Sequence, residues 1–470
     1  MFKRLMVLCL CLMVTGAVSA QPDPNADCTG AGYSTPRLTA GMAAQMVAGE
    51  TVNIHADADV SSPVVSQLEP SSQITLNIGP HCHEGLVWWQ FQFQLSQGDG
   101  NSPYGWIPET LDGGDVLEPV VQSLTLPGSQ PITSDNVSEL TQVAQLDYGG
   151  VRLFTWSPDS AMIAISTTGA IWLHERSGLS GMPLKPNGFD RNLTDTMRFS
   201  ADGSQFAAVG ASTNDSNAVP MLHVWSTQSG DLVSSQTFNQ SDYAYVAALS
   251  PDFSTLATAQ WDGTITLWDT ASAQPRAVLT RHQAVGVLHF TPDGQTLISV
   301  GGYGMDTPDS TLRLWDVANG TQRALIELDS TITAVAISPD NQQLALLVPV
   351  LNAATGYMEG ELWFISVDDA STFRKIPLDV TLGAVDFNAD GSLLVVARSH
   401  IDDERGQWAS SLRFFDTASG QQVADLPMNL NLLDVAFSPD TSSLVLSHVV
   451  PDFPGSVAVT FWAVPSAPAG

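Results

Sequence analysis

The chain has 470 residues, of which 48 are acidic and 17 are basic, so its formal net charge is −31. Apolar residues make up 44% of the sequence, which is enough to build hydrophobic cores and excludes a wholly disordered chain. The strong negative balance repels phosphate backbones and anionic lipid surfaces. The composition therefore argues against a nucleic-acid partner.

The first 20 residues have the pattern of a secretory signal peptide. Lys3 and Arg4 precede an apolar run over residues 5–14, and small residues follow at 17–20. The run is too short to span a bilayer, and no later stretch of about 18 apolar residues follows it. We therefore expect an exported protein, secreted, on the cell surface or periplasmic, without membrane insertion.

Removal of residues 1–20 leaves two of the four cysteines, Cys28 and Cys82. Two cysteines in an exported chain most simply form one disulfide. The sequence His81-Cys82-His83 also raises the possibility of a metal site, but adjacent residues of a strand point to opposite faces and there is no second ligand cluster. We predict a Cys28–Cys82 disulfide and no metal site.

Residues 21–122 predict a small β-barrel domain. Apolar and polar residues alternate over residues 73–78 and 89–94, and Gly, Pro and Ser separate the short strands. The region resembles the bacterial SH3-like (SH3b) domain, although His55 stands where that family usually has Arg and Ser71-Ser72 where it usually has a turn Gly. The motifs that carry the resemblance are Thr51-Val52-Asn53-Ile54, Ser62-Pro63-Val64-Val65, Gly79-Pro80, Gly85, Trp88-Trp89-Gln90-Phe91, Gly105-Trp106-Ile107 and Leu117-Glu118-Pro119.

The SH3-like resemblance implies two further features. A leading cysteine in exported members often accompanies a second one, as Cys28 would accompany Cys82. An exposed aromatic groove can hold an extended peptide, and cell-wall peptides are common ligands of bacterial relatives. The candidate groove residues are Trp88, Trp89, Tyr104 and Trp106. The alternative is that one Trp of each pair is a core residue and the other packs against the next domain.

Residues 123–136 contain Pro, Gly and Ser without periodicity and predict a linker. A repeat follows, in which an apolar residue, Ser/Thr/Asn, Pro/Ala and Asp form a turn. Pro sets φ at the first corner, and Asp bonds its own backbone two residues on. The aspartates of the seven turns are Asp159, Asp202, Asp252, Asp293, Asp340, Asp390 and Asp440.

Each turn is followed by an apolar strand and then by a strand with an aromatic residue, such as Trp268 or Trp315. The seven aspartates are about 47 residues apart on average, and a repeat of this length with four short strands is typical of a propeller blade. Residues 137–465 resemble the WD40 family through Leu267-Trp268-Asp269, Leu314-Trp315-Asp316 and Asp262-Gly263. The family's Gly-His dipeptide is absent, and only Arg281-His282 comes near it, so we do not expect its hydrogen-bonded tetrad in most blades.

The last repeat has no fourth strand, whereas residues 139–146 resemble the outer strands at 274–279 and 321–326. We expect this early strand to complete the last blade and remove an open sheet edge. The predicted fold is all-β: an SH3-like barrel at 21–122, then a seven-bladed β-propeller at 137–465 closed by an N-terminal strand, with a tail at 466–470.

Five connections between second and third strands are long, at residues 210–220, 301–310, 349–360, 399–410 and 448–456. They would emerge on one face, which is common for a binding surface. The alternative is solvated loops. Their aromatic residues are Tyr303, Tyr357, Trp408 and Phe453. Their acidic residues are Asp215, Asp306, Asp309, Glu359, Asp402, Asp403, Glu404 and Asp452.

The sequence contains none of the common nucleophile, zinc or phosphate-loop motifs. We therefore expect an exported, non-enzymatic interaction scaffold without cofactor, which binds a protein, a peptide or a cell-wall glycan. One alternative is an extracellular propeller enzyme, a hydrolase or lyase acting on polymers, with its site at the channel mouth. Another is a purely structural role in the cell envelope.

Overall fold

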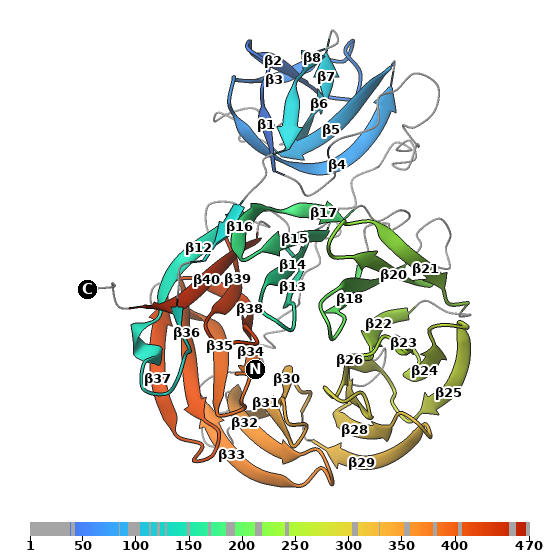
Figure 1. Ribbon diagram of the computed structural model, residues 1–470, viewed down its shortest axis with the longest axis vertical. Coiled ribbons are helices and arrows are strands. Elements are labelled where there is room, and N and C mark those ends of the chain that lie inside the picture. Colours follow the sequence, from blue (N-terminus) through green and yellow to red (C-terminus); the bar gives the residue numbers. More distant parts are fainter. Residues whose placement is uncertain are drawn as a thin grey trace, which may run out of the picture. The chain divides into compact units, whose positions relative to one another are not determined.

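The computed structural model describes residues 38, 43–83, 85–92, 104–111, 114–119, 123–126, 129–147, 151–167, 171–184, 193–211, 219–239, 244–302, 309–328, 330–351, 358–378, 383–402, 407–450 and 457–466. Within these ranges the fold is all-β, with antiparallel sheets, one 3-10 helix η1 (Val137–Glu139) and no α-helix (Figure 1). No helix there is long and apolar enough to cross a membrane. The chain divides into two compact units, one with the strands up to Pro119 and the other from Val120 onward.

The first unit is built on a seven-stranded sheet of order β3-β2-β6-β5-β4-β1-β9. Its core includes Ile54, Leu76, Phe91 and Ile107, which are at most 1% exposed. The short alternating strands predicted from the sequence are therefore present. Their bounds are β1 Ala43–Met46, β2 Val52–His55, β3 Val64–Leu68, β4 Gln73–His83, β5 Leu86–Gln92, β6 Tyr104–Pro108 and β9 Leu117–Pro119, with a separate pair β7 Thr110–Leu111 and β8 Gly114–Asp115.

Six four-stranded sheets follow one another in the second unit, each with its strands in chain order. They comprise β13 Leu153–Trp156, β14 Met162–Ser166, β15 Ile171–Glu175 and β17 Met182–Leu184; β18 Leu193–Phe199, β19 Gln205–Ala211, β20 Pro220–Ser226 and β21 Leu232–Thr237; β22 Ala244–Leu249, β23 Thr255–Gln260, β24 Thr264–Asp269 and β25 Gln274–Thr280; β26 Val285–Phe290, β27 Thr296–Gly301, β28 Thr311–Asp316 and β29 Thr321–Glu327; β30 Ala334–Ile337, β31 Gln343–Leu351, β32 Met358–Ser366 and β33 Thr372–Leu378; and β34 Gly383–Phe387, β35 Leu393–Asp402, β36 Gln407–Asp416 and β37 Gln422–Met428.

The last sheet is completed by a strand from the start of the unit. It contains β38 (Asn431–Phe437), β39 (Leu444–Val449) and β40 (Val457–Pro465), and β12 (Thr141–Asp147) pairs with β40 from Thr141 opposite Ala463 to Asp147 opposite Ala458. The prediction that an early strand completes the last repeat is confirmed. Figure 1 shows β12 beside β40, so the two ends of the second unit share one sheet.

The linker predicted at residues 123–136 is ordered in part and belongs to the second unit. Within it, β10 (Ser123–Thr125) pairs with β16 (Ser177–Ser180), and β11 (Ser129–Gln130) pairs with β40. Strand pairing at a sheet edge uses backbone groups, so polar residues without periodicity can still form such strands. The segment expected to be a linker therefore contains two short edge strands.

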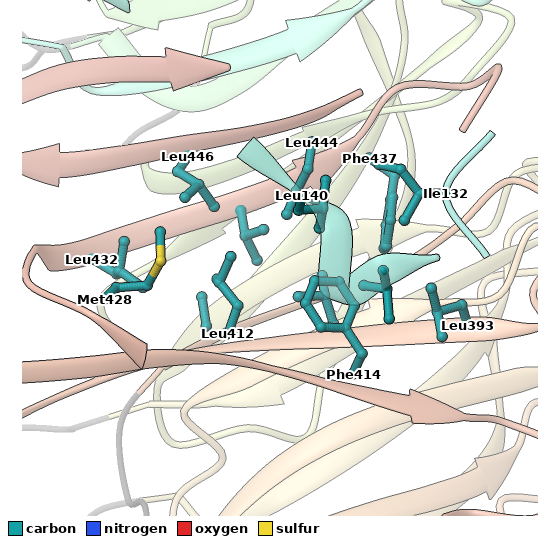
Figure 2. Close-up of a cluster of buried hydrophobic side chains, with 14 of the residues drawn as sticks. Ile132, Leu140, Leu393, Leu412, Phe414, Met428, Leu432, Phe437, Leu444 and Leu446 are labelled. Carbon is teal, nitrogen blue, oxygen red and sulfur yellow. The ribbon is translucent and has the colours of Figure 1, made fainter. Parts of the chain in front are cut away.

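The segment after β11 also packs into the core between the last two sheets. Ile132, Val137 and Leu140 are at most 8% exposed, and Figure 2 shows Ile132 and Leu140 among side chains of β35–β39 such as Phe414 and Phe437. Burying one such aliphatic side chain stabilises a fold by about 1.5–3 kcal/mol. The early segment is thus fixed by hydrophobic contacts as well as by strand pairing.

The repeated turn has the local structure that its residues predict. In the third sheet, the Ser250 hydroxyl donates to Asp252 Oδ1 at 2.6 Å and the amide of Ser254 donates to the same oxygen at 3.0 Å. The residue after Asp takes the left-handed conformation, as at Gly203 with φ of 70° and Gly294 with φ of 71°. These aspartates are therefore structural.

Candidate functional site

Two of the four aromatic residues predicted to line a peptide groove in the first unit are core residues. Trp88 is 1% exposed and Trp89 is 0% exposed, and Trp89 Nε1 donates to the buried Glu109 carboxylate at 2.9 Å. Trp88 packs edge-on against His55 at 5.6 Å. Neither side chain can contact a ligand in this conformation, which corrects the sequence-based assignment.

The other two aromatic residues of the predicted groove lie at the surface. Tyr104 is 40% exposed, and Trp106 is half-buried with its ring 5.7 Å from the ring of His81. Burial lowers the pKa of His81, so this imidazole is neutral at neutral pH. Tyr104 and Trp106 both lie on β6 and are the aromatic candidates that remain in the first unit.

The aromatic residues predicted on the long connections of the second unit are mostly outside the described residues. Tyr303, Tyr357 and Phe453 fall there, as do Asp215, Asp306, Asp403, Glu404 and Asp452. Trp408 lies on β36, where its backbone pairs with Ile401. Residues 349–351, 358–360, 399–402 and 407–410 continue the strands of two long hairpins, so the loops predicted there are shorter than expected.

Asp309, predicted to belong to an acidic surface, is instead buried in a hydrogen-bond network. Its side chain is 4% exposed, and Oδ2 lies 2.9 Å from His282 Nδ1. His282 Nε2 lies 2.7 Å from Ser299 Oγ, which accepts from Trp315 Nε1 at 2.7 Å. Thr311 Oγ1 donates to Asp309 Oδ1 at 2.6 Å. The assignment of Asp309 to a binding surface was wrong.

The protonation of this network follows from its geometry. Hydrogen bonds from Thr311 and from the amide of Gln283 hold the pKa of Asp309 below its usual value although burial opposes them, so the carboxylate is ionised. Burial lowers the pKa of His282 despite the nearby Asp309 charge, so the imidazole is neutral at neutral pH. His282 Nδ1 therefore donates to Asp309, and Nε2 accepts from the Ser299 hydroxyl. Every polar side chain of the chain Trp315–Ser299–His282–Asp309 is satisfied.

The network fixes the loop before β26 against a neighbouring turn. The turn between β23 and β24 contains Trp261, Asp262 and Gly263, and a Cβ atom at Gly263 would lie 2.2 Å from the carbonyl oxygen of His282. Gly263 has φ of 80°, and Asp262 Oδ1 accepts from the amide of Thr264 at 2.9 Å. The turn is therefore rigid and lies directly against the loop that carries His282.

This rigid pair of loops presents an exposed tryptophan. Trp261 is 54% exposed, although large aromatic side chains are usually buried, and Arg281, next to His282, is also exposed. We call Trp261 and Arg281 the Trp261 surface. Leu351, 62% exposed at the end of β31, belongs to the same kind of second-to-third-strand connection. Trp261 was not among the residues predicted from sequence, because its connection is short and only long connections were expected to bind; its sequence signal is the Trp261-Asp262-Gly263 turn.

The sequence also raised the possibilities of a metal site at His81-Cys82-His83 and of a Cys28–Cys82 disulfide. Within the described ranges, no group of three or more His, Cys, Asp or Glu side chains could hold a metal ion. Cys82 lies half-buried on β4, whereas Cys28 lies outside the described residues. The Cys28–Cys82 disulfide therefore stays a prediction.

Comparison with known families finds a match in the part of the chain that contains the hydrogen-bond network. Residues 232–269 and 273–316 match the family described as WD domain, G-beta repeat. The second matched segment contains all four members of the network, His282, Ser299, Asp309 and Trp315, and the first contains Trp261. No curated protein matches the chain. The matched repeats suggest a protein-interaction scaffold.

Proposed function

We propose that this protein is an exported, non-enzymatic scaffold whose second unit is a seven-bladed WD40-like propeller. Six four-stranded sheets and a seventh sheet shared by β12 and β38–β40 support this assignment. Three contacts join the first and seventh sheets: Trp156 packs against Phe461 at 6.0 Å, the amide of Asp440 donates to Ser160 Oγ at 2.9 Å, and Arg176 Nη1 donates to Asp440 Oδ2 at 2.6 Å.

The observation that carries the binding function is the exposure of Trp261 on a rigid turn. Aromatic and Arg side chains contribute most to many protein interfaces, since they bury large areas at a small entropic cost. Arg281, which precedes His282 on the loop that adjoins the turn at Gly263, adds donors for a carboxylate or carbonyl of the partner. Two well-ordered loops need no rearrangement on binding, which favours affinity. The partner is a protein, a peptide or a cell-wall glycan.

The first unit is proposed to be an SH3-like barrel that supplies a second contact through Tyr104 and Trp106. Two modest sites on one chain strengthen binding to a single partner that spans both, because the second contact becomes intramolecular. The formal charge of −31 disfavours nucleic acids and anionic lipid surfaces as partners. The signal-peptide pattern of residues 1–20 supports the proposal that the protein is exported.

The test is capture of partners from envelope and culture fractions with the mature protein and two variants. Trp261→Ala removes the exposed ring from the proposed surface. Phe373→Ala is the control, because Phe373 is 51% exposed on the outer strand β33. The proposal predicts that Trp261→Ala loses the captured partner whereas Phe373→Ala retains it. Equal capture by both variants would reject the Trp261 surface. Deletion of residues 43–119 would then show whether the first unit carries binding.

A further inference from the structure

One position of the repeat lies on the first strand of each sheet and precedes the residue that begins the turn. First strands that follow one another pack together, as β13, β18, β22 and β26 do, and Figure 1 shows them facing a common centre. This position is small or apolar in most sheets. In chain order its residues are Thr155, Arg198, Ala248, His289, Ala336, Asp386 and Ala436.

Arg198 is unusual among the described arginines. Arg152 and Arg281 are exposed, and seven others donate to carboxylates, hydroxyls, amides or carbonyl oxygens. Those seven are Arg176, Arg276, Arg313, Arg323, Arg374, Arg398 and Arg413. Arg198 is half-buried and has no hydrogen-bond or ion-pair partner within the described part of the chain. Burial lowers its pKa, and no carboxylate opposes that effect.

His289 is the second potential cation on these first strands. It occupies the same repeat position as Arg198, and the strand between them has only Ala248 there. His289 keeps solvent-accessible surface, but desolvation by the surrounding protein, together with the charge of Arg198, lowers its pKa to about 4. The two side chains therefore lie within electrostatic range of each other, and no carboxylate contributes to the pKa of either.

The described acidic side chains of the first strands lie on other sheets, whereas Asp195 lies on β18 itself and its side chain is outside the described residues. Asp386 on β34 accepts from the amide of Phe437 at 2.8 Å, and Asp434 on β38 accepts from the amide of Val435 at 2.8 Å. Burial and the charge of Asp434 raise the pKa of Asp386, and neither carboxylate contributes to the pKa of Arg198 or His289. A bound anion would be repelled from that side and attracted to the side of β18 and β26.

We propose that Arg198 and His289 bind a small oxyanion, a carboxylate or a phosphate group, on the inner face of the second unit. The guanidinium offers paired N–H donors with the spacing of carboxylate or phosphate oxygens, and the neutral imidazole offers one more donor. The anion would supply the negatively charged partner that Arg198 lacks among the described residues. The equivalent position on the strand between them, β22, carries only the small side chain of Ala248. This site is separate from the Trp261 surface and does not depend on the partner proposed there.

The test is calorimetric titration of the full mature chain with inorganic phosphate and, separately, with succinate, at constant ionic strength. The proposal predicts saturable binding of at least one anion, and the tighter of the two identifies the chemistry. Arg198→Gln should weaken binding by about tenfold or more, since it removes the charged donor of the hydrogen bonds to the anion. Arg152→Gln removes the same charge from an exposed position and should leave the affinity unchanged.

Three results would overturn the proposal: no saturable binding of either anion, equal affinity in Arg198→Gln and the wild type, or equal losses in the Arg198 and Arg152 variants. Circular dichroism and the melting temperature establish that each variant is folded. If Arg198→Gln does not fold, His289→Gln replaces it, and retention of full affinity in that variant contradicts the site.

Discussion

Arg176, which follows β15, contacts the turn between β38 and β39, and its replacement perturbs the contact between the two ends of the second unit. Its side chain is 20% exposed. Nη1 donates to Asp440 Oδ2 at 2.6 Å, and Nη2 donates to the hydroxyls of Ser442 at 2.6 Å and Ser443 at 3.2 Å. The residues of the ion pair are 264 positions apart in the chain, so the contact exists only when the two ends of the unit meet.

The expected loss in Arg176→Ala can be worked out from these contacts. The ion pair with Asp440, which is 43% exposed, contributes no more than about 1 kcal/mol because solvent screens it. Each hydroxyl bond from the charged guanidinium adds about 1 kcal/mol, so the total is about 3 kcal/mol. Arg413→Ala is the matched control: Arg413 Nε pairs with Asp425 Oδ2 at 3.1 Å between two strands of one sheet. We expect about 1 kcal/mol for that variant.

The assay is urea unfolding of the full mature chain followed by far-ultraviolet circular dichroism. The Arg176 variant should unfold at clearly lower urea than the Arg413 variant. Arg176→Lys should recover part of the loss, since an ammonium retains the charge but not the paired donors. The reasoning is refuted if Arg176→Ala is no more destabilising than Arg413→Ala.

Three further predictions concern the buried network, a buried carboxyl and the cysteines. Ser299→Ala leaves two buried partners, His282 Nε2 and Trp315 Nε1, unsatisfied and should cost about 3 kcal/mol in urea unfolding; unchanged stability would contradict the network. Burial raises the pKa of Asp386 to about 7, so its ionisation destabilises the fold as pH rises toward that value. The melting temperature of Asp386→Asn should therefore increase relative to that of the wild type between pH 5 and pH 8. A difference in melting temperature that is independent of pH would disprove the raised pKa of Asp386. Peptide mapping of the unreduced protein should show Cys28 joined to Cys82, whereas two alkylatable thiols in the native protein would exclude the disulfide.

The repeated turn could be predicted from sequence because its chemistry is local. Ser or Thr, Pro and Asp satisfy one another's backbone groups within five residues, as the contact of Thr291 Oγ1 with Asp293 Oδ1 at 2.6 Å shows. The strand at 141–147 was also predictable, since the last repeat lacked a fourth strand and the early segment had the matching pattern. Both inferences needed only spacing and side-chain type.

Features that depend on distant partners could not be predicted in this way. Asp309 looked like a surface residue because its partner His282 is 27 positions away, and only the fold brings them together. The strands β10 and β11 pair through backbone groups at sheet edges, which leave no periodic pattern. Trp88 and Trp89 are adjacent and both buried, against the alternation expected of a strand.

Amide hydrogen exchange over β12 tests most directly the claim that the two ends of the second unit share one sheet. If β12 completes that sheet in solution, amides of residues 141–147 are protected as strongly as those of 457–465, and Arg176→Ala lowers protection in both segments together. Exchange of residues 141–147 at the rate of an unstructured peptide, with protection retained at 457–465, would contradict the closed arrangement.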